Sequence, residues 1–139
     1  MPVLPVRALV VDDNPGHRQL LTAVLQSKGL DVFAVNDGRE AVAIASSTCF
    51  ALILMDASMP IMDGHTATRL IREHEVEAGW PRANIIMVTS HDTSADVARS
   101  RAAGADGHVN KPINVGELVA AIDARRARAA RAVAKSCAA

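Results

Sequence analysis

The stretch "ALILMDASMPIMDG", from Ala51 to Gly64, decides the fold of this chain through its strongly apolar run, which ends in a charged residue. The run from Ala51 to Met55 is apolar throughout and has the length of a β-strand. A strand without in–out alternation is typical of a parallel sheet covered on both faces. A lone carboxylate such as Asp56 is costly there unless it has a partner, so this position indicates a function.

The segments on either side of this stretch also alternate between short apolar runs and helical patterns. Further strands are predicted at residues 7–11, 30–35, 84–89 and 107–110. The predicted helices begin at Asn14-Pro15 and close at Gly29, cover about 39–47, follow Asp63-Gly64, cover 94–103 before Gly104, and begin at Asn114 with Glu117 completing a capping box. Five strand–helix units predict an α/β fold with helices on both faces of a parallel sheet.

The chain has 139 residues, the size of one domain, and half of them are hydrophobic. We predict a single domain over residues 1–125 and a basic, alanine-rich tail over 126–139. This end of the chain could form an arm for nucleic acid, but it has no aromatic residues and no recognition helix. A helix extension or a disordered tail is therefore favoured. The basic residues at this end of the chain are Arg125, the last residue of the predicted domain, and Arg126, Arg128, Arg131 and Lys135 of the tail.

The composition is that of an ordinary soluble protein. The formal net charge is zero, which gives no whole-chain attraction to nucleic acid or to an anionic membrane. The start "MPVLPVR" does not resemble a signal peptide, and no apolar run approaches the roughly 20 residues that span a bilayer. Cys49 and Cys137 form no disulfide framework, which favours a reducing, cytoplasmic location.

Polar residues follow four of the predicted strands. Because ligands bind at the carboxyl ends of strands in an open α/β sheet, we expect these side chains to converge. They are Asp12 and Asp13 after the first strand, Asp56 after the third, Thr89 and Ser90 at the end of the fourth, and Lys111 after the fifth. Taken singly, four of them have an ordinary structural explanation: Asp12 and Asp13 as a helix cap, Thr89 as a strand residue and Lys111 as a surface lysine. Their joint placement favours a functional site.

Three neighbouring carboxylates would repel one another unless they held a cation. Oxygen ligands of this kind favour Mg²⁺, which completes its coordination with water or phosphate oxygens. A carboxylate such as Asp56, flanked by Mg²⁺, the ammonium of Lys111 and a hydroxyl, has what is needed to attack phosphorus. The five histidines show no paired metal-ligand spacing, so no zinc site is expected. His91 could reach the mouth of the site, although a solvated loop histidine is favoured.

The motifs "VVDDN", "LILMDASMPIMDG", "IIMVTS" and "VNKP" together resemble the receiver domain of two-component response regulators over about residues 7–125. The resemblance implies a flavodoxin-like doubly wound sheet with strand order 2-1-3-4-5. It also implies that Asp56 accepts a phosphoryl group from a histidine kinase or a histidine phosphotransfer protein. A downstream protein would then bind the face formed by helix four, strand five and helix five, and phosphorylation could cause homodimerisation.

The same resemblance assigns roles around Asp56. It implies that Asp13 and Asp56 ligate Mg²⁺ directly, that Asp12 acts through water and that Ser58 offers its backbone carbonyl. Thr89 would hydrogen-bond a phosphoryl oxygen and Lys111 would pair with it, next to a cis Lys111-Pro112 bond. The sequence departs from the family at His108, where receivers carry Tyr or Phe as a rotating switch residue. The chain has no tyrosine, so coupling between Thr89 and an aromatic ring is in doubt.

Two other readings remain open at this point. A haloacid-dehalogenase-type phosphohydrolase also uses Asp, Mg²⁺, Thr or Ser, and Lys, but its nucleophile resembles Asp-x-Asp after the first strand and no cap domain is visible. The segment "MDASMPIMDGHTATRLIRE" is similar to receivers of hybrid histidine kinases, so the chain could be a piece of one. The start at Met1 and the short tail favour a free-standing chain that is a signalling phosphoacceptor and not an enzyme.

Overall fold

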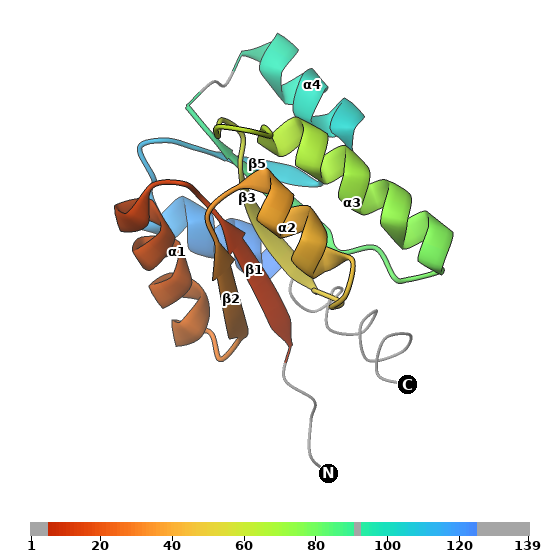
Figure 1. Cartoon of the computed structure of the whole chain (residues 1–139). Coiled ribbons are helices and arrows are strands. Elements are labelled where there is room, and N and C mark those ends of the chain that lie inside the picture. Colours follow the sequence, from red (N-terminus) through yellow and green to blue (C-terminus); the bar gives the residue numbers. More distant parts are fainter. Residues whose placement is uncertain (1–5, 91–92, 125–139) are drawn as a thin grey trace.

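The computed structural model describes residues 6–90 and 93–124, so the predicted tail, His91 and Cys137 lie outside the described residues. Five parallel strands form one sheet in the order β2-β1-β3-β4-β5, as expected (Figure 1). The strands are β1 (Arg7–Val11), β2 (Asp31–Val35), β3 (Leu52–Asp56), β4 (Asn84–Thr89) and β5 (Gly107–Asn110). The helices are α1 (Pro15–Ser27), α2 (Gly38–Ala45), α3 (Gly64–Ala78) and α4 (Ser94–Ala103), and residues 115–124 are also helical.

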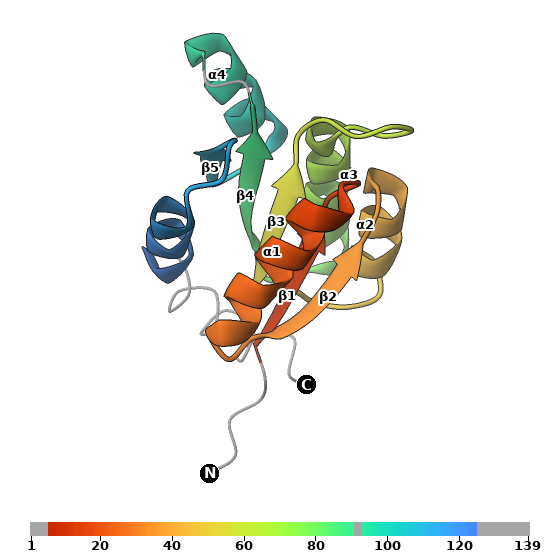
Figure 2. The ribbon, with the colours of Figure 1, turned by 90° about the vertical axis from the view of Figure 1, so that its left-hand side faces the viewer.

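Alternate residues of the strands point to opposite faces and build two cores. On one face Leu9, Ile53 and Ile85 pack with Ala67 and Ile71 of α3. On the other face Val10 and Leu54 pack with Leu25 of α1 and Leu118 of the segment 115–124. Figure 2 shows these helix layers on either side of the strands. Every residue of β3 and β4 is buried, which confirms the prediction of fully covered central strands.

Helix starts follow the predicted capping residues closely. Asn14 accepts the backbone N–H of His17 at 3.1 Å, and Asn114 accepts that of Glu117 at 3.0 Å. Helix ends are less well predicted. The C-cap of α1 is Lys28, with Gly29 next to it at φ 79°, and α2 ends at Ala45 because Ser46 caps it and its hydroxyl donates to Val42 O at 2.7 Å.

A partly buried ionic network joins α3 to the turn between α4 and β5. Arg72 Nη2 lies 2.8 Å from Asp106 Oδ2, its Nη1 lies 2.7 Å from Glu75 Oε1, and its Nε donates to Gly104 O at 2.9 Å. Arg82 reaches Asp106 Oδ1 at 2.9 Å. Burial alone would raise the pKa of Asp106, but the backbone N–H of Ile85 and the two arginines hold it below its usual range. The network therefore anchors edge strand β5 to α3.

Arg72→Ala is expected to lower the free energy of unfolding by about 3 kcal/mol, because it leaves the buried Glu75 carboxylate without its cation and Asp106 with Arg82 alone. Urea unfolding at neutral pH measures the change. Arg69→Ala is the matched control, since Arg69 is exposed on the same helix and its removal should cost no more than about 0.5 kcal/mol. Equal losses in the two variants would show that the network does not stabilise the fold.

No helix within the described residues is long and apolar enough to cross a membrane.

Candidate functional site

The parallel register brings the predicted polar residues together at the carboxyl ends of the strands. Val11 pairs with Met55, so Asp12, which follows β1, lies level with Asp56 at the end of β3. Asp56 pairs with Val88, and Thr89 is the next residue of β4. Thr89 in turn pairs with Asn110, and Lys111 follows directly. The predicted convergence of strand ends is therefore present in the fold.

Asp12, Asp13 and Asp56 form an acidic cluster in which one carboxylate oxygen from each lies within 4.8 Å of the others. Asp12 is 0% and Asp56 is 2% exposed, whereas Asp13 is exposed at the mouth. At this spacing two ionised carboxylates repel by about 3 kcal/mol at an effective dielectric constant of about 20. In the described part of the chain this is the one group of such side chains close enough to share an ion. The cluster can therefore hold a metal ion.

Asp56 lies between a positive charge and a backbone donor. Lys111 Nζ is 3.2 Å from Asp56 Oδ1, and the backbone N–H of Ser58 donates to the same oxygen at 3.2 Å. Burial raises the pKa of Asp56 to about 6 and the nearby charge of Asp12 adds to this, although Ser58 and Lys111 oppose it. Without a further cation, the carboxyl group of Asp56 is protonated in about half of the molecules near pH 6.

Asp12 is the carboxylate whose surroundings best fit a metal. Its Oδ1 accepts the backbone N–H of Asn14 at 2.8 Å, which fixes the side chain. Its Oδ2 is buried and has no hydrogen-bond partner among the described residues. Among the described residues, Lys111 Nζ lies 4.0 Å from Oδ2 and the ring Nδ1 of His17 lies 3.8 Å from it. A buried, unsatisfied carboxylate oxygen is suited to ligation of a cation.

The loop after β3 presses against the backbone of Asp56. The N–H of Gly64 donates to Ala57 O at 3.0 Å, and a Cβ at Gly64 would lie 2.2 Å from Asp56 O. Ile61 has φ 73° and is 73% exposed, and Met62 N donates across it to Pro60 O at 2.8 Å. This is a three-residue turn of the rare, strained type. The sequence indicated turns here but not these two backbone requirements.

Lys111 and Thr89 lie where the sequence predicted them. Lys111 N donates to Thr89 O at 2.7 Å, and the Lys111-Pro112 bond is cis, as the resemblance implied. Thr89 is buried at the end of β4 and Ser58 is exposed beside Asp56. The roles of Thr89, of the Ser58 carbonyl and of His108 stay predictions.

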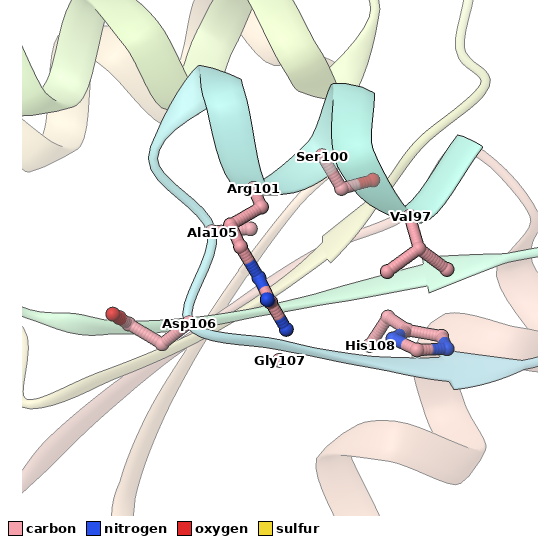
Figure 3. Close-up of a pocket in the computed structure, with 7 residues that line it drawn as sticks. All are labelled: Val97, Ser100, Arg101, Ala105, Asp106, Gly107 and His108. Carbon is pink, nitrogen blue, oxygen red and sulfur yellow. The ribbon is translucent and has the colours of Figure 1, made fainter. Parts of the chain in front are cut away.

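His108 is exposed on β5, next to a hollow between β5 and α4 (Figure 3). In Figure 3 Val97 lies over His108, and Arg101 reaches from α4 toward Gly107. The hollow has a volume of about 10 Å³, which is room for no more than one water molecule. The imidazole therefore could enter this space only if α4 moved.

Asp56→Asn is expected to stabilise the metal-free protein at neutral pH. A folded-state pKa of about 6, raised from the usual 3.8, means that the stability of the wild type falls as pH rises between these values. The loss reaches at most about 3 kcal/mol above pH 6, and asparagine does not suffer it. Urea unfolding in EDTA at pH 4 and pH 7.5 should show the variant's advantage only at pH 7.5. An equal difference at both pH values would contradict this explanation.

Sequence comparisons place the chain among known signalling proteins. Residues 8–123 match the family model described as the response regulator receiver domain. The chain is 32% identical over 118 residues to hybrid signal transduction histidine kinase A of Dictyostelium discoideum, covering 84% of this chain and 6% of that protein. It is 35% identical over 128 residues to the DNA-binding response regulator MtrA of Mycolicibacterium smegmatis, covering 92% of this chain and 54% of that protein. The chain thus spans about half or less of these curated relatives.

Solved structures with the same fold include a chemotaxis protein and the receiver domain of a sensor histidine kinase. Vibrio cholerae chemotaxis protein CheY4 superposes with a TM-score of 0.79 and 30% identity, over 87% of this chain and 98% of that chain. The receiver domain of sensor histidine kinase PA1611 from Pseudomonas aeruginosa, with a magnesium ion in its active-site cleft, has a TM-score of 0.76 and 33% identity, over 87% and 97%.

Proposed function

We propose that this chain, which belongs to the response regulator receiver domain family, accepts a phosphoryl group on Asp56 and changes its binding to a partner protein as a result. The observation that carries the proposal is the contact of the buried Asp56 carboxylate with Lys111 at 3.2 Å, inside the acidic cluster. The family acts as a signalling phosphoacceptor, so the chain is expected to take up one phosphoryl group and not to turn over a substrate.

In this proposal an Asp56 carboxylate oxygen attacks the phosphorus of a phosphohistidine on a histidine kinase or a histidine phosphotransfer protein. The new bond joins oxygen to phosphorus, the phosphorus–nitrogen bond breaks, and the departing imidazole takes a proton. Lys111 Nζ, already 3.2 Å from Asp56 Oδ1, would pair with a phosphoryl oxygen. Thr89, one residue beyond the level of Asp56 on β4, would donate its hydroxyl to another.

We assign the metal to Mg²⁺, because all the expected ligands are oxygen atoms. Asp13 and Asp56 would bind it directly, Asp12 would act through water, and Ser58 would offer its backbone carbonyl. When bound, Mg²⁺ would keep Asp56 ionised and stabilise the negative charge that develops on the phosphoryl oxygens. The unsatisfied Asp12 Oδ2 and the magnesium ion in the related PA1611 receiver support this assignment.

The output surface proposed here consists of α4, β5 and the helical segment 115–124. Phosphorylation would draw Thr89 toward the phosphoryl group and shift α4 between two arrangements, which changes the affinity for a protein partner or a second copy of this chain. His108 takes the place of the usual aromatic residue on β5 and is exposed in this structure. Its inward rotation, coupled to movement of α4, remains part of the proposal.

The setting of the chain also belongs to the proposal. We expect a cytoplasmic location, no direct binding to nucleic acid, and service either as a free-standing regulator or as the receiver segment of a hybrid kinase. The phosphohydrolase alternative gains no support, because the candidate nucleophile ends the third strand of the chain.

Phosphotransfer profiling tests the function directly. The donors are purified histidine kinases that have autophosphorylated and purified histidine phosphotransfer proteins that a kinase has phosphorylated. Each is mixed with the wild-type chain and with Asp56→Asn in the presence of Mg²⁺. Rapid, selective transfer of label from at least one donor to the wild type alone supports the proposal. Equal labelling of the variant, or steady turnover of p-nitrophenyl phosphate by the wild type, would refute it.

A further inference from the structure

The acidic site is in close contact with the first turn of α3. Gly64 opens α3, its N–H donates to Ala57 O at 3.0 Å, and a Cβ on it would lie 2.2 Å from Asp56 O. Backbone segments packed this closely leave no free space between them, so a shift of the Asp56 backbone must carry the start of α3 with it. His65 is the next residue of that turn. It therefore follows any movement at the site.

The side chain of His65 joins α3 to α4. Its Nε2 and the hydroxyl oxygen of Ser100 share a hydrogen bond of 3.1 Å, and Figure 1 shows α4 beside the start of α3. Burial lowers the pKa of His65 and the charge of Arg99 adds to this, although Asp63 and Asp96 oppose it. The imidazole is therefore neutral at pH 7.5. A serine hydroxyl can donate to such a ring or accept from it, so either tautomer keeps the bond.

Little else fastens α4 to the sheet. Ser100, at 6% exposure, is the one fully buried residue of α4, all of whose residues the structure describes. Val97 is half-buried, and the hollow of about 10 Å³ between α4 and β5 lies beside both residues (Figure 3). A helix that buries a serine and no large apolar side chain gains little from the hydrophobic effect. The bond to His65 therefore has a large share in positioning α4.

We propose that the His65–Ser100 hydrogen bond holds α4 in the arrangement described here, and that phosphorylation of Asp56 breaks it and so frees α4 for a protein partner. His108 is exposed in this arrangement, which is the starting point of the proposed switch. The inference rests on the proposed function and adds to it a positioning residue, His65. Because this contact faces α3 and not β5, it couples α4 to the site without an aromatic residue at position 108.

Amide hydrogen exchange of the chain at pH 7.5, without phosphodonor, tests the contact itself. We expect His65→Leu and Ser100→Ala each to speed the exchange of α4 amides about fivefold, as loss of one neutral hydrogen bond requires. His65→Gln keeps a polar group that can bond to Ser100 and should restore slow exchange. Exchange of α4 that is unchanged in His65→Leu, or as fast in His65→Gln as in His65→Leu, would overturn the inference.

Binding of beryllofluoride, an analogue of the phosphoryl group, in the presence of Mg²⁺ tests the coupling to Asp56. Because coupling is reciprocal, freeing α4 should raise the affinity for beryllofluoride by up to about fivefold in His65→Leu and Ser100→Ala. Loss of stability alone would not strengthen binding. Thr93→Ala is the matched control, because Thr93 caps α4 by accepting the N–H of Asp96 at 3.2 Å and its removal loosens α4 without touching His65.

The control should leave the affinity for beryllofluoride unchanged. Affinity that stays the same in His65→Leu and Ser100→Ala, or that rises equally in Thr93→Ala, would overturn this inference alone. A wild-type chain that binds no beryllofluoride would count against the proposed function, and hydrogen exchange would still decide whether His65 positions α4.

Discussion

Gly64→Ala is expected to displace the backbone of Asp56, at the carboxyl end of β3, and to destabilise the fold. The added Cβ would lie 2.2 Å from Asp56 O and 2.9 Å from Ala57 Cα, and both are backbone atoms that cannot move aside cheaply. We expect the free energy of unfolding to fall by about 3 kcal/mol or more. Phosphoryl uptake should fall as well, because the Asp56 backbone must shift. Urea unfolding and labelling by a small phosphodonor measure the two effects.

Gly79→Ala is the control for this prediction. Gly79 caps α3 at φ 70°, but a Cβ there would meet no atom within 4 Å. Its replacement should cost only about 1 kcal/mol of backbone strain and should leave phosphoryl uptake intact. Equal destabilisation of the two variants would show that the contact with Asp56 does not make Gly64 necessary.

Asp13→Asn is expected to abolish most of the affinity for Mg²⁺ with little effect on the fold. Asp13 is exposed at the mouth of the acidic cluster, so asparagine fits without loss of packing. Two opposite unit charges 4 Å apart attract by about 4 kcal/mol at an effective dielectric constant of about 20. Losing only about 2 kcal/mol of this attraction would raise the dissociation constant for Mg²⁺ about 30-fold. Titration of amide chemical shifts with Mg²⁺ measures the constant.

Asp31→Asn serves as the control for Asp13→Asn. Asp31 is exposed at the start of β2, at the amino ends of the strands, whereas the acidic cluster lies at their carboxyl ends. It removes the same charge from the chain without touching the cluster. A comparable loss of Mg²⁺ affinity in this variant, or full affinity in Asp13→Asn, would exclude Asp13 as a direct ligand.

The strand ends were predictable because the signals are local. An apolar run that stops at Asp56 or at Thr89 shows in the sequence both the strand and the residue it presents. Parallel strands then bring those ends to one edge, as the register shows. Helix starts were predictable for the same reason, since Asn14 and Asn114 bond to the N–H three residues later. Ends of helices were displaced where short polar side chains such as Ser46 compete for backbone groups.

Features that depend on distant contacts could not be predicted. The closeness of Gly64 to Asp56 O arises from the path of a loop, and the sequence shows only an Asp-Gly turn. Arg72 and Asp106 are 34 positions apart and meet only when α3 covers the sheet. Leu20, next to the buried Leu21 on α1, is apolar yet 37% exposed, because helical periodicity does not fix the edge of the buried stripe.

Intact-mass measurement with a small phosphodonor tests the central claim most directly. The chain is incubated with Mg²⁺ and acetyl phosphate, its mass is measured, and fragmentation locates the modification. We predict that the wild type gains the mass of one phosphoryl group on Asp56 and that Asp56→Asn gains none. A wild type that stays unmodified, or a phosphoryl group that is found on another residue in both proteins, would contradict the assignment of Asp56 as the phosphoacceptor.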